Sequence, residues 1–125
     1  MKVLILGGSG MLGNAVVTEF LKNKDFEVFV TARDLSLLER YLTSNPCISM
    51  AKKFDCINNS SNLPNLLKGM DYVVNCIGVI KPFINNSIKD SIFINSFFPH
   101  LLADYANQVG VKVINITTDC VFSGK

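Results

Sequence analysis

The chain has 125 residues, 49% of them hydrophobic, and a formal net charge of +2. That length and hydrophobic content suit one compact domain with its own core and exclude a disordered chain. The basic residues are scattered, which argues against nucleic acid and membrane surfaces as partners, and no apolar run is long enough to cross a bilayer. We expect a cytoplasmic protein with no metal site, because the N-terminus lacks a signal-peptide pattern and the four cysteines lack metal-ligand spacing.

Strand-like and helix-like patterns alternate along the chain. Apolar runs predict strands, and apolar residues recurring every three or four positions predict helices. In chain order we expect a strand over 2–6, a helix over 11–22, a strand over 27–32, a helix that Asp34 caps and Asn45-Pro46 stops, a weaker strand over 50–56, a short helix over 62–68, a strand over 71–77, a polar loop over 81–89, a long helix over 91–109 and a strand over 112–117. Such alternation implies right-handed βαβ units. The fold class is therefore α/β: one Rossmann-like domain over residues 1–125, with a doubly wound parallel sheet of five strands in the order 3-2-1-4-5.

Two of the predicted helices have an apolar face that we expect to point into the core. In the first helix this face comprises Leu12, Val16, Val17, Phe20 and Leu21. In the long helix it comprises Ile94, Phe97, Phe98, Leu101, Leu102, Tyr105 and Val109.

Four glycines lie between the first strand and the first helix, with the spacing Gly7-x-x-Gly10-x-x-Gly13 and Gly8 beside them. A tight turn, a close backbone approach to a diphosphate and close packing of the helix each require a residue without Cβ. The helix N-terminus also offers unpaired N–H groups to phosphates. This pattern predicts dinucleotide binding; the alternative is a purely structural turn, for which four glycines are more than is needed.

Arg33 lies at the end of the second predicted strand, 20 residues after Gly13. NAD-binding proteins carry an acidic residue near this point for the adenine ribose. A guanidinium instead suits a 2′-phosphate, so we expect NADP(H), with NAD as the alternative. The other interpretation is an exposed Arg33 that confers no selectivity, and the adjacent Asp34 is better suited to capping the next helix.

The segments GGSGMLG, NCIGVIKP and INITTDCVFSGK resemble the extended short-chain dehydrogenase/reductase superfamily, and within it the sugar-nucleotide reductases similar to dTDP-4-dehydrorhamnose reductase. The resemblance implies that Thr118 is the catalytic residue that hydrogen-bonds the substrate oxygen, with Thr117 beside it. It also implies a set of cofactor-binding positions. These are Gly7, Ser9, Gly10, Met11, Leu12 and Gly13 at the pyrophosphate, Arg33 at the 2′-phosphate, Asp55 and Cys56 beside the adenine, Asn75, Cys76, Ile77 and Gly78 along the ribose and nicotinamide, Asn95 in the long helix, and Thr117 beside Thr118.

Several of these residues also have plain structural interpretations. Asp55 is equally suited to an ordinary turn, and Asn75 and Asn95 could satisfy backbone groups in the core. Thr117 also suits a strand end. His100, on a helix rich in Phe and Leu, is better explained as a structural residue than as a catalyst.

The sequence departs from the superfamily pattern in one respect. The superfamily's general acid is a Tyr followed four residues later by Lys, beyond the TTD segment, whereas Tyr41, Tyr72 and Tyr105 have no Lys at that spacing. We therefore expect the N-terminal part of a longer reductase, truncated before the rest of the family fold. The parent would reduce a keto group of a nucleotide-linked deoxysugar in surface-polysaccharide biosynthesis. The alternatives are an NAD-linked sugar-nucleotide epimerase or dehydratase and a non-catalytic dinucleotide-binding module. The expected partners are a nucleotide-sugar substrate of the full-length parent and a second copy of the chain, paired through the edge of the last strand.

Overall fold

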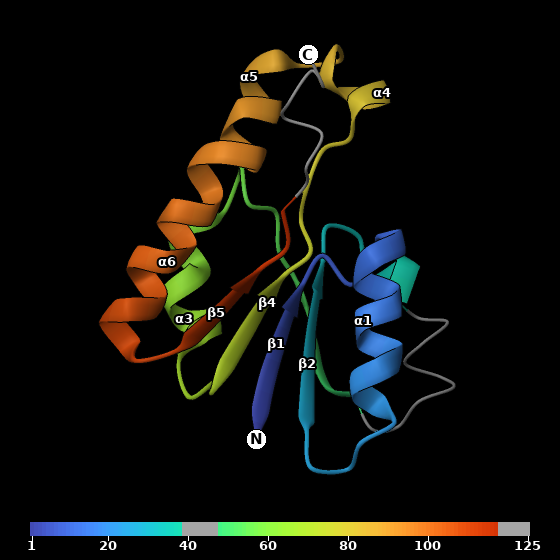
Figure 1. The fold of residues 1–125 in the computed structure, drawn as a ribbon, viewed down its shortest axis with the longest axis vertical. Coiled ribbons are helices and arrows are strands. Elements are labelled where there is room, and N and C mark those ends of the chain that lie inside the picture. Colours follow the sequence, from blue (N-terminus) through green and yellow to red (C-terminus); the bar gives the residue numbers. More distant parts are fainter. Residues whose placement is uncertain (39–47, 118–125) are drawn as a thin grey trace, which may run out of the picture.

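Five strands form one parallel sheet in the order β3-β2-β1-β4-β5 (Figure 1). The computed structural model describes residues 1–38 and 48–117. The strands are β1 (Lys2–Leu6), β2 (Glu27–Ala32), β3 (Ile48–Lys53), β4 (Tyr72–Asn75) and β5 (Lys112–Asn115). This order confirms the predicted fold class, because the chain starts in the middle of the sheet, builds outward to one edge and then crosses to build the other half.

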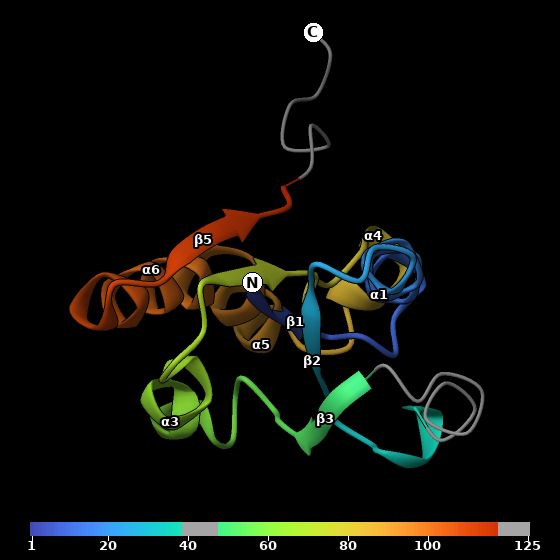
Figure 2. The same cartoon turned by 90° about the horizontal axis from the view of Figure 1, so that it is seen from below.

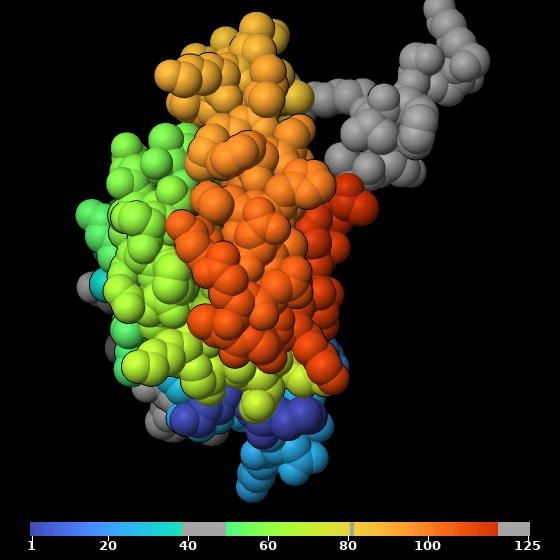
Figure 3. Space-filling model, turned by 90° about the vertical axis from the view of Figure 1, so that its left-hand side faces the viewer, coloured from blue at the N-terminus to red at the C-terminus, as the bar shows by residue number. Residues whose placement is uncertain are grey.

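Helices cover both faces of the sheet (Figure 2). The helical elements are α1 (Met11–Leu21), a 3₁₀ turn η1 (Ser60–Asn62), α3 (Leu63–Leu67), α4 (Lys81–Ile84), α5 (Ile88–Ile92), a π-helical segment η2 (Phe93–Phe97) and α6 (Phe98–Val109). Helix α1 lies on one face of the sheet. Helices α3 and α6 lie on the other face, side by side, as the space-filling view shows (Figure 3). In the part of the chain that the structure describes, no helix is long and apolar enough to cross a membrane.

The continuous apolar run of β1 is explained by burial on both sides. Val3 and Ile5 belong to the cluster packed against α1. Leu4 and Leu6 belong to the cluster beneath α3 and α6. All four side chains are buried. Successive residues of a strand point to opposite faces, so a central strand with helices on both sides buries apolar side chains on both of its faces.

The structure corrects several predicted element boundaries. The fourth strand ends at Asn75 rather than at residue 77, and the fifth strand ends at Asn115 rather than at residue 117. The third strand ends at Lys53 rather than at residue 56, which leaves Asp55 and Cys56 in the turn that follows. The segment over residues 81–89, expected to be a polar loop, contains α4 and the start of α5. Ser87 caps α5 by accepting a hydrogen bond from the Asp90 N–H at 3.3 Å. A serine cap three residues before an acidic residue is a helix-start signal that the sequence did contain.

The long helix buries a narrower stripe than its sequence predicts. Phe97 is 56% exposed and Val109 is 45% exposed, so neither belongs to the core. The buried residues follow each other at a spacing of four: Ile94, Phe98, Leu102 and Ala106. The π-helical segment accounts for part of the difference, because its wider turn changes the direction of side chains relative to a regular helix. Leu12, also expected in the core, is 43% exposed, and the buried residues of α1 are Gly13 and Val17.

Candidate dinucleotide site

The glycine-rich turn connects β1 to α1 with backbone conformations that side chains would obstruct. Gly7 has a φ of 79°, a left-handed conformation that L side chains rarely adopt. A Cβ at Gly7 would also lie 3.0 Å from Ile77 Cγ1. A Cβ at Gly13 would collide with the carbonyl oxygen of Gly7 and lie 2.9 Å from the Cα of Gly8. These two glycines are therefore required by the protein's own packing.

Gly10 has no such internal requirement. Its φ of −74° and ψ of 164° suit any residue, and the nearest atom to a Cβ there would be the Gly7 oxygen at 3.5 Å, an ordinary contact. Gly10 is the N-cap of α1, it provides no side-chain cap, and the first turn has no acidic residue. Asn14 is the first residue whose N–H bonds back to Gly10, at 2.8 Å. The N-terminal amides and the positive end of the helix dipole thus fit a phosphate anion, and the missing Cβ keeps the approach to them open.

Thr31 of β2 fixes the position of this turn, and sequence reasoning did not identify it. Its carbonyl oxygen accepts a hydrogen bond from the Gly8 N–H at 2.8 Å, and its Oγ1 accepts one from the Gly7 N–H at 3.4 Å. Thr31 is buried. Arg33 follows two residues later, beyond the strand end, with an exposed side chain. The bonds to Thr31 therefore hold the turn beside the strand that leads into Arg33.

Asp55 lies in the turn after β3, where its carboxylate is engaged by its own neighbours. Oδ1 accepts from the Ile57 N–H at 2.9 Å, and Oδ2 accepts from Asn58 Nδ2 at 3.0 Å. Partial burial alone would raise the pKa of Asp55, but these hydrogen bonds and the charge of Arg33 lower it below its usual value. The Asp55 N–H also donates to Asn59 Oδ1, at 2.6 Å. The turn interpretation of Asp55 thus describes its contacts, and a role beside an adenine stays a prediction. Asp55, Asn58 and Asn59 line an open cleft of about 320 Å³ together with Lys53.

The segment after β4 contacts the glycine turn from the other side. Asn75, at the end of β4, is buried; its Nδ2 donates to Asn115 Oδ1 at 2.8 Å, and its Oδ1 accepts from the Ile77 N–H at 3.2 Å. Burial raises the pKa of the Cys76 thiol to about 11. A Cβ at Gly7 would lie 3.3 Å from the carbonyl carbon of Cys76. Asn115 of β5 is a second residue that the sequence did not point to, because its partner is 40 positions away.

The remaining predicted positions have different surroundings. Gly78 lies beside Asn95, whose side chain bonds to the next residue of the loop, Val79. Met11 and Thr117 are exposed, and Ser9 is partly buried. Cys56 is buried, and burial raises the pKa of its thiol to about 11. Thr118 lies outside the described residues. Across residues 1–38 and 48–117, no group of three or more His, Cys, Asp or Glu side chains could hold a metal ion.

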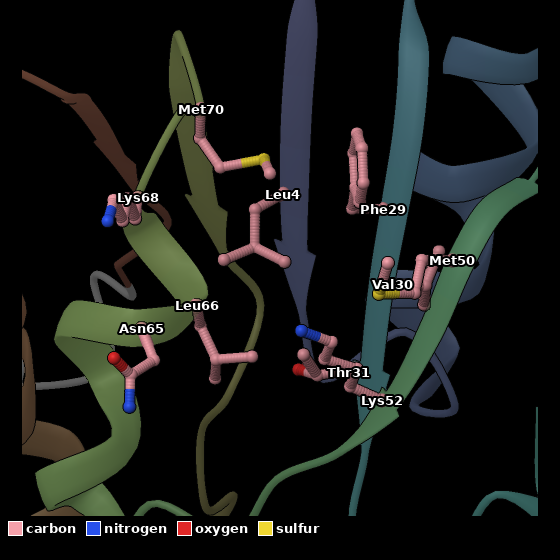
Figure 4. A pocket seen from close by; sticks show the side chains of 10 residues that line it. All are labelled: Leu4, Phe29, Val30, Thr31, Met50, Lys52, Asn65, Leu66, Lys68 and Met70. Carbon is pink, nitrogen blue, oxygen red and sulfur yellow. The ribbon is translucent and has the colours of Figure 1, made fainter.

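A second cleft, of about 160 Å³, lies between α3 and the sheet (Figure 4). Its apolar walls include Leu4 of β1, Phe29 of β2 and Leu66 of α3. Lys52 of β3 lines it near the carboxyl end of the sheet. None of the predicted site residues lines this cleft.

A parallel sheet in the order 3-2-1-4-5, with a glycine turn leading into the N-terminus of the first helix, defines the nucleotide-binding half of a Rossmann-type, short-chain dehydrogenase/reductase fold. The family model of the RmlD substrate binding domain matches residues 1–125, and the chain belongs to this family of extended, NAD(P)-binding short-chain dehydrogenases/reductases.

Similarity to individual proteins supports the same assignment. The chain is 38% identical over 77 residues to a UDP-glucose 4-epimerase of Rickettsia bellii, covering 57% of this chain and 22% of the relative. It is 32% identical over 101 residues to the chloroplastic divinyl chlorophyllide a 8-vinyl-reductase of Arabidopsis thaliana, covering 73% of this chain and 22% of the relative. The chain thus spans about a fifth of the curated relatives that it matches.

Solved structures share the fold at low sequence identity. A UDP-glucuronic acid 4-epimerase from Bacillus cereus in complex with NAD superposes with a TM-score of 0.82 at 20% identity, covering all of this chain and 42% of the epimerase. A short-chain dehydrogenase/reductase from Saccharomyces cerevisiae gives a TM-score of 0.77 at 23% identity, covering 97% of this chain and 55% of that protein.

Proposed function

We propose that this chain is the NADP(H)-binding part of a sugar-nucleotide reductase that reduces a keto group of a nucleotide-linked deoxysugar in surface-polysaccharide biosynthesis. The NADP(H) assignment depends on two features that occur together. The N-terminus of α1 begins at Gly10, which has no side-chain cap and no Cβ, and an exposed Arg33 directly follows β2. The first group suits a pyrophosphate, and the second suits a phosphate on the adenine ribose. Membership of the RmlD substrate binding domain family supports the sugar-nucleotide part of the proposal.

In this proposal each part of the site has a separate task. The amides of Met11 and Leu12 bind the pyrophosphate, and Arg33 binds the 2′-phosphate. The segment from Cys76 to Gly78 forms the wall along the ribose and nicotinamide. The bound nicotinamide supplies the hydride, and the protein contributes orientation and exclusion of water. Thr118 orients the substrate oxygen by a hydrogen bond. Residues 1–125 form the N-terminal, cofactor-binding part of a longer protein whose remainder holds the sugar nucleotide.

The second candidate is an NAD-linked epimerase. It is favoured by the UDP-glucose 4-epimerase among the curated relatives and by the UDP-glucuronic acid 4-epimerase that was solved with NAD. The two candidates differ at the 2′-phosphate, which only NADP(H) carries. Arg33 favours the reductase, since a guanidinium beside a bare ribose diol gains little and a carboxylate is the usual partner there.

Isothermal titration of the chain with NADPH and NADH separates the candidates. Tighter binding of NADPH supports the proposal, and Arg33→Ala should then remove most of the difference. Arg33→Lys keeps the charge but not the paired donors, so it should retain part of it. Equal affinities in the unsubstituted chain would contradict the NADP(H) assignment. For the reductase activity, NADPH oxidation by the full gene product is followed by absorbance with a panel of nucleotide-linked 4-keto sugars; no turnover with any of them would contradict it.

A further inference from the structure

The last residue of β3 lies beside the end of β2, close to Arg33. Lys53 pairs with Ala32 in the parallel register, and the Phe54 N–H continues the ladder by donating to the Ala32 oxygen at 2.9 Å. Ala32 is the residue immediately before Arg33. The two strand ends are therefore level, and Lys53 lies across from the residue before Arg33 at the carboxyl edge of the sheet, where Rossmann folds bind their ligands.

Lys52, the residue before Lys53, lies on the opposite face of the sheet. Lys52 pairs with Thr31 and lines the apolar cleft beneath α3 with it (Figure 4). Successive side chains of a strand point to opposite faces, so Lys53 does not share that cleft. Lys53 instead lines the open cleft beyond the strand end, with Asp55, Asn58 and Asn59. Lys52 and Lys53 therefore line two separate clefts.

Acidic and basic side chains lie close to one another at this edge of the sheet. Arg33 is close enough to Asp55 to help lower the pKa of that carboxyl, after the hydrogen bonds that outweigh its partial burial. The pKa of Asp34 is lowered by hydrogen bonds from Ser36 and also by the charge of Lys53. Both acids already have local partners. Asp34 Oδ1 accepts from the Ser36 N–H at 3.0 Å and from Ser36 Oγ at 2.8 Å, and Asp55 accepts from its own turn. The carboxylates are held by their turns, while both cationic side chains are exposed.

From this arrangement we infer that Lys53 is a second specificity-determining residue, which binds the phosphate on the adenine ribose together with Arg33. This inference rests on the proposed NADP(H) binding and adds a residue that the glycine and Arg33 signals did not point to. A phosphomonoester carries nearly two negative charges at neutral pH. Arg33 supplies a planar, forked donor set, and Lys53 supplies a compact charge from the neighbouring strand. Because NAD lacks this phosphate, Lys53 affects the choice between the cofactors rather than binding in general.

The test compares Lys53→Gln with Lys52→Gln in the 125-residue chain, by isothermal titration with NADP⁺ and NAD⁺. Lys53→Gln should weaken NADP⁺ binding by about three- to tenfold and leave NAD⁺ binding unchanged within about twofold. Unchanged NAD⁺ binding also shows that the variant is folded. Lys53→Arg should retain the preference. Lys52→Gln removes the same charge one residue away on the other face, so it controls for a general loss of positive potential.

Three outcomes are distinguishable. A loss of NADP⁺ affinity confined to Lys53→Gln, and reduced in high salt as expected for an exposed charge pair, supports the inference. Equal effects of the two glutamine variants, in a chain that prefers NADP⁺, overturn the role of Lys53 and leave the proposed function intact. An unsubstituted chain that binds NAD⁺ as tightly as NADP⁺ overturns the NADP(H) assignment and the inference with it.

Discussion

The side-chain amide of Asn95 forms two hydrogen bonds with the backbone of a single residue, Val79. Its Oδ1 accepts from the Val79 N–H at 2.8 Å, and its Nδ2 donates to the Val79 oxygen, also at 2.8 Å. Asn95 lies in the π-helical segment, and Val79 lies in the loop that leaves β4. This pair therefore ties the helix to the wall of the candidate site. Of the two interpretations of Asn95, the one in which it satisfies backbone groups describes these contacts.

Replacing Asn95 with Ala should loosen the loop after β4. Two hydrogen bonds are lost, which should lower the free energy of unfolding by about 1–2 kcal/mol and reduce the protection of the Val79 amide in hydrogen exchange. Binding of NADPH and NADH should weaken together, because the loop forms part of the wall that we propose for both. Asn95→Asp keeps the acceptor and loses the donor, so its effect should be intermediate. Ser96→Ala changes an exposed neighbour in the same segment and is the control. Unchanged exchange at Val79 in Asn95→Ala would contradict this role.

Substitution of two glycines in the same turn should affect different properties, cofactor binding at Gly10 and stability at Gly13. Gly10→Val should fold with nearly unchanged stability but bind both cofactors weakly, because space exists in the protein but is needed by the ligand. Gly13→Ala should lower the free energy of unfolding by about 1–3 kcal/mol, because its Cβ would collide with the Gly7 backbone. Urea unfolding and titration with NADPH measure the two effects separately. A Gly10→Val protein that binds NADPH normally would show that the helix N-terminus is not the phosphate site.

The thiols of Cys56 and Cys76 should react slowly at neutral pH. Burial is the main reason that the pKa of each thiol is raised to about 11, so at pH 8 only about 0.1% of either is thiolate. Alkylation by iodoacetamide, followed by mass spectrometry of peptides, should accelerate about tenfold per pH unit above pH 8 at both positions. The same peptides in urea should react rapidly and give the reference rate. Cys76 contacts the glycine turn, so NADPH should slow its alkylation further. Rapid labelling of folded protein at pH 7 would be inconsistent with this burial.

The Asp55 turn should make stability dependent on acid pH. The pKa of Asp55 in the folded protein lies below its ordinary value of 3.8, so its contribution is fully present above about pH 5 and is lost as pH falls through the folded pKa. Asp55→Asn should therefore be less stable than the unsubstituted chain at pH 7, with a difference that shrinks below about pH 4. Asn58→Ala removes one donor to the carboxylate and should show part of the effect. Urea unfolding at several pH values measures it, and a difference that does not vary with pH would count against the carboxylate.

The sequence by itself determined the class of fold and the place of the glycine turn. Alternating strand and helix patterns leave few topologies, because parallel crossovers are right-handed and consecutive elements pack as neighbours. Together with the glycine turn directly after the first strand, that restriction favours the order 3-2-1-4-5. The left-handed backbone of Gly7 and the contact of Gly13 with the Gly7 backbone are likewise local, since both residues lie in the turn between two elements whose positions the pattern predicts.

Only the tertiary structure decided which polar side chains meet. Asn75 reaches Asn115 across 40 positions, and Lys53 reaches the neighbourhood of Arg33 because two strands end at the same level. Such contacts depend on register, which periodicity in one strand does not contain. Regular helical spacing predicts that Phe97 lies in the core, whereas the π-helical segment departs from that spacing and Phe97 is exposed. Sequence patterns report each element's own period, whereas the site is formed where the ends of several elements come together.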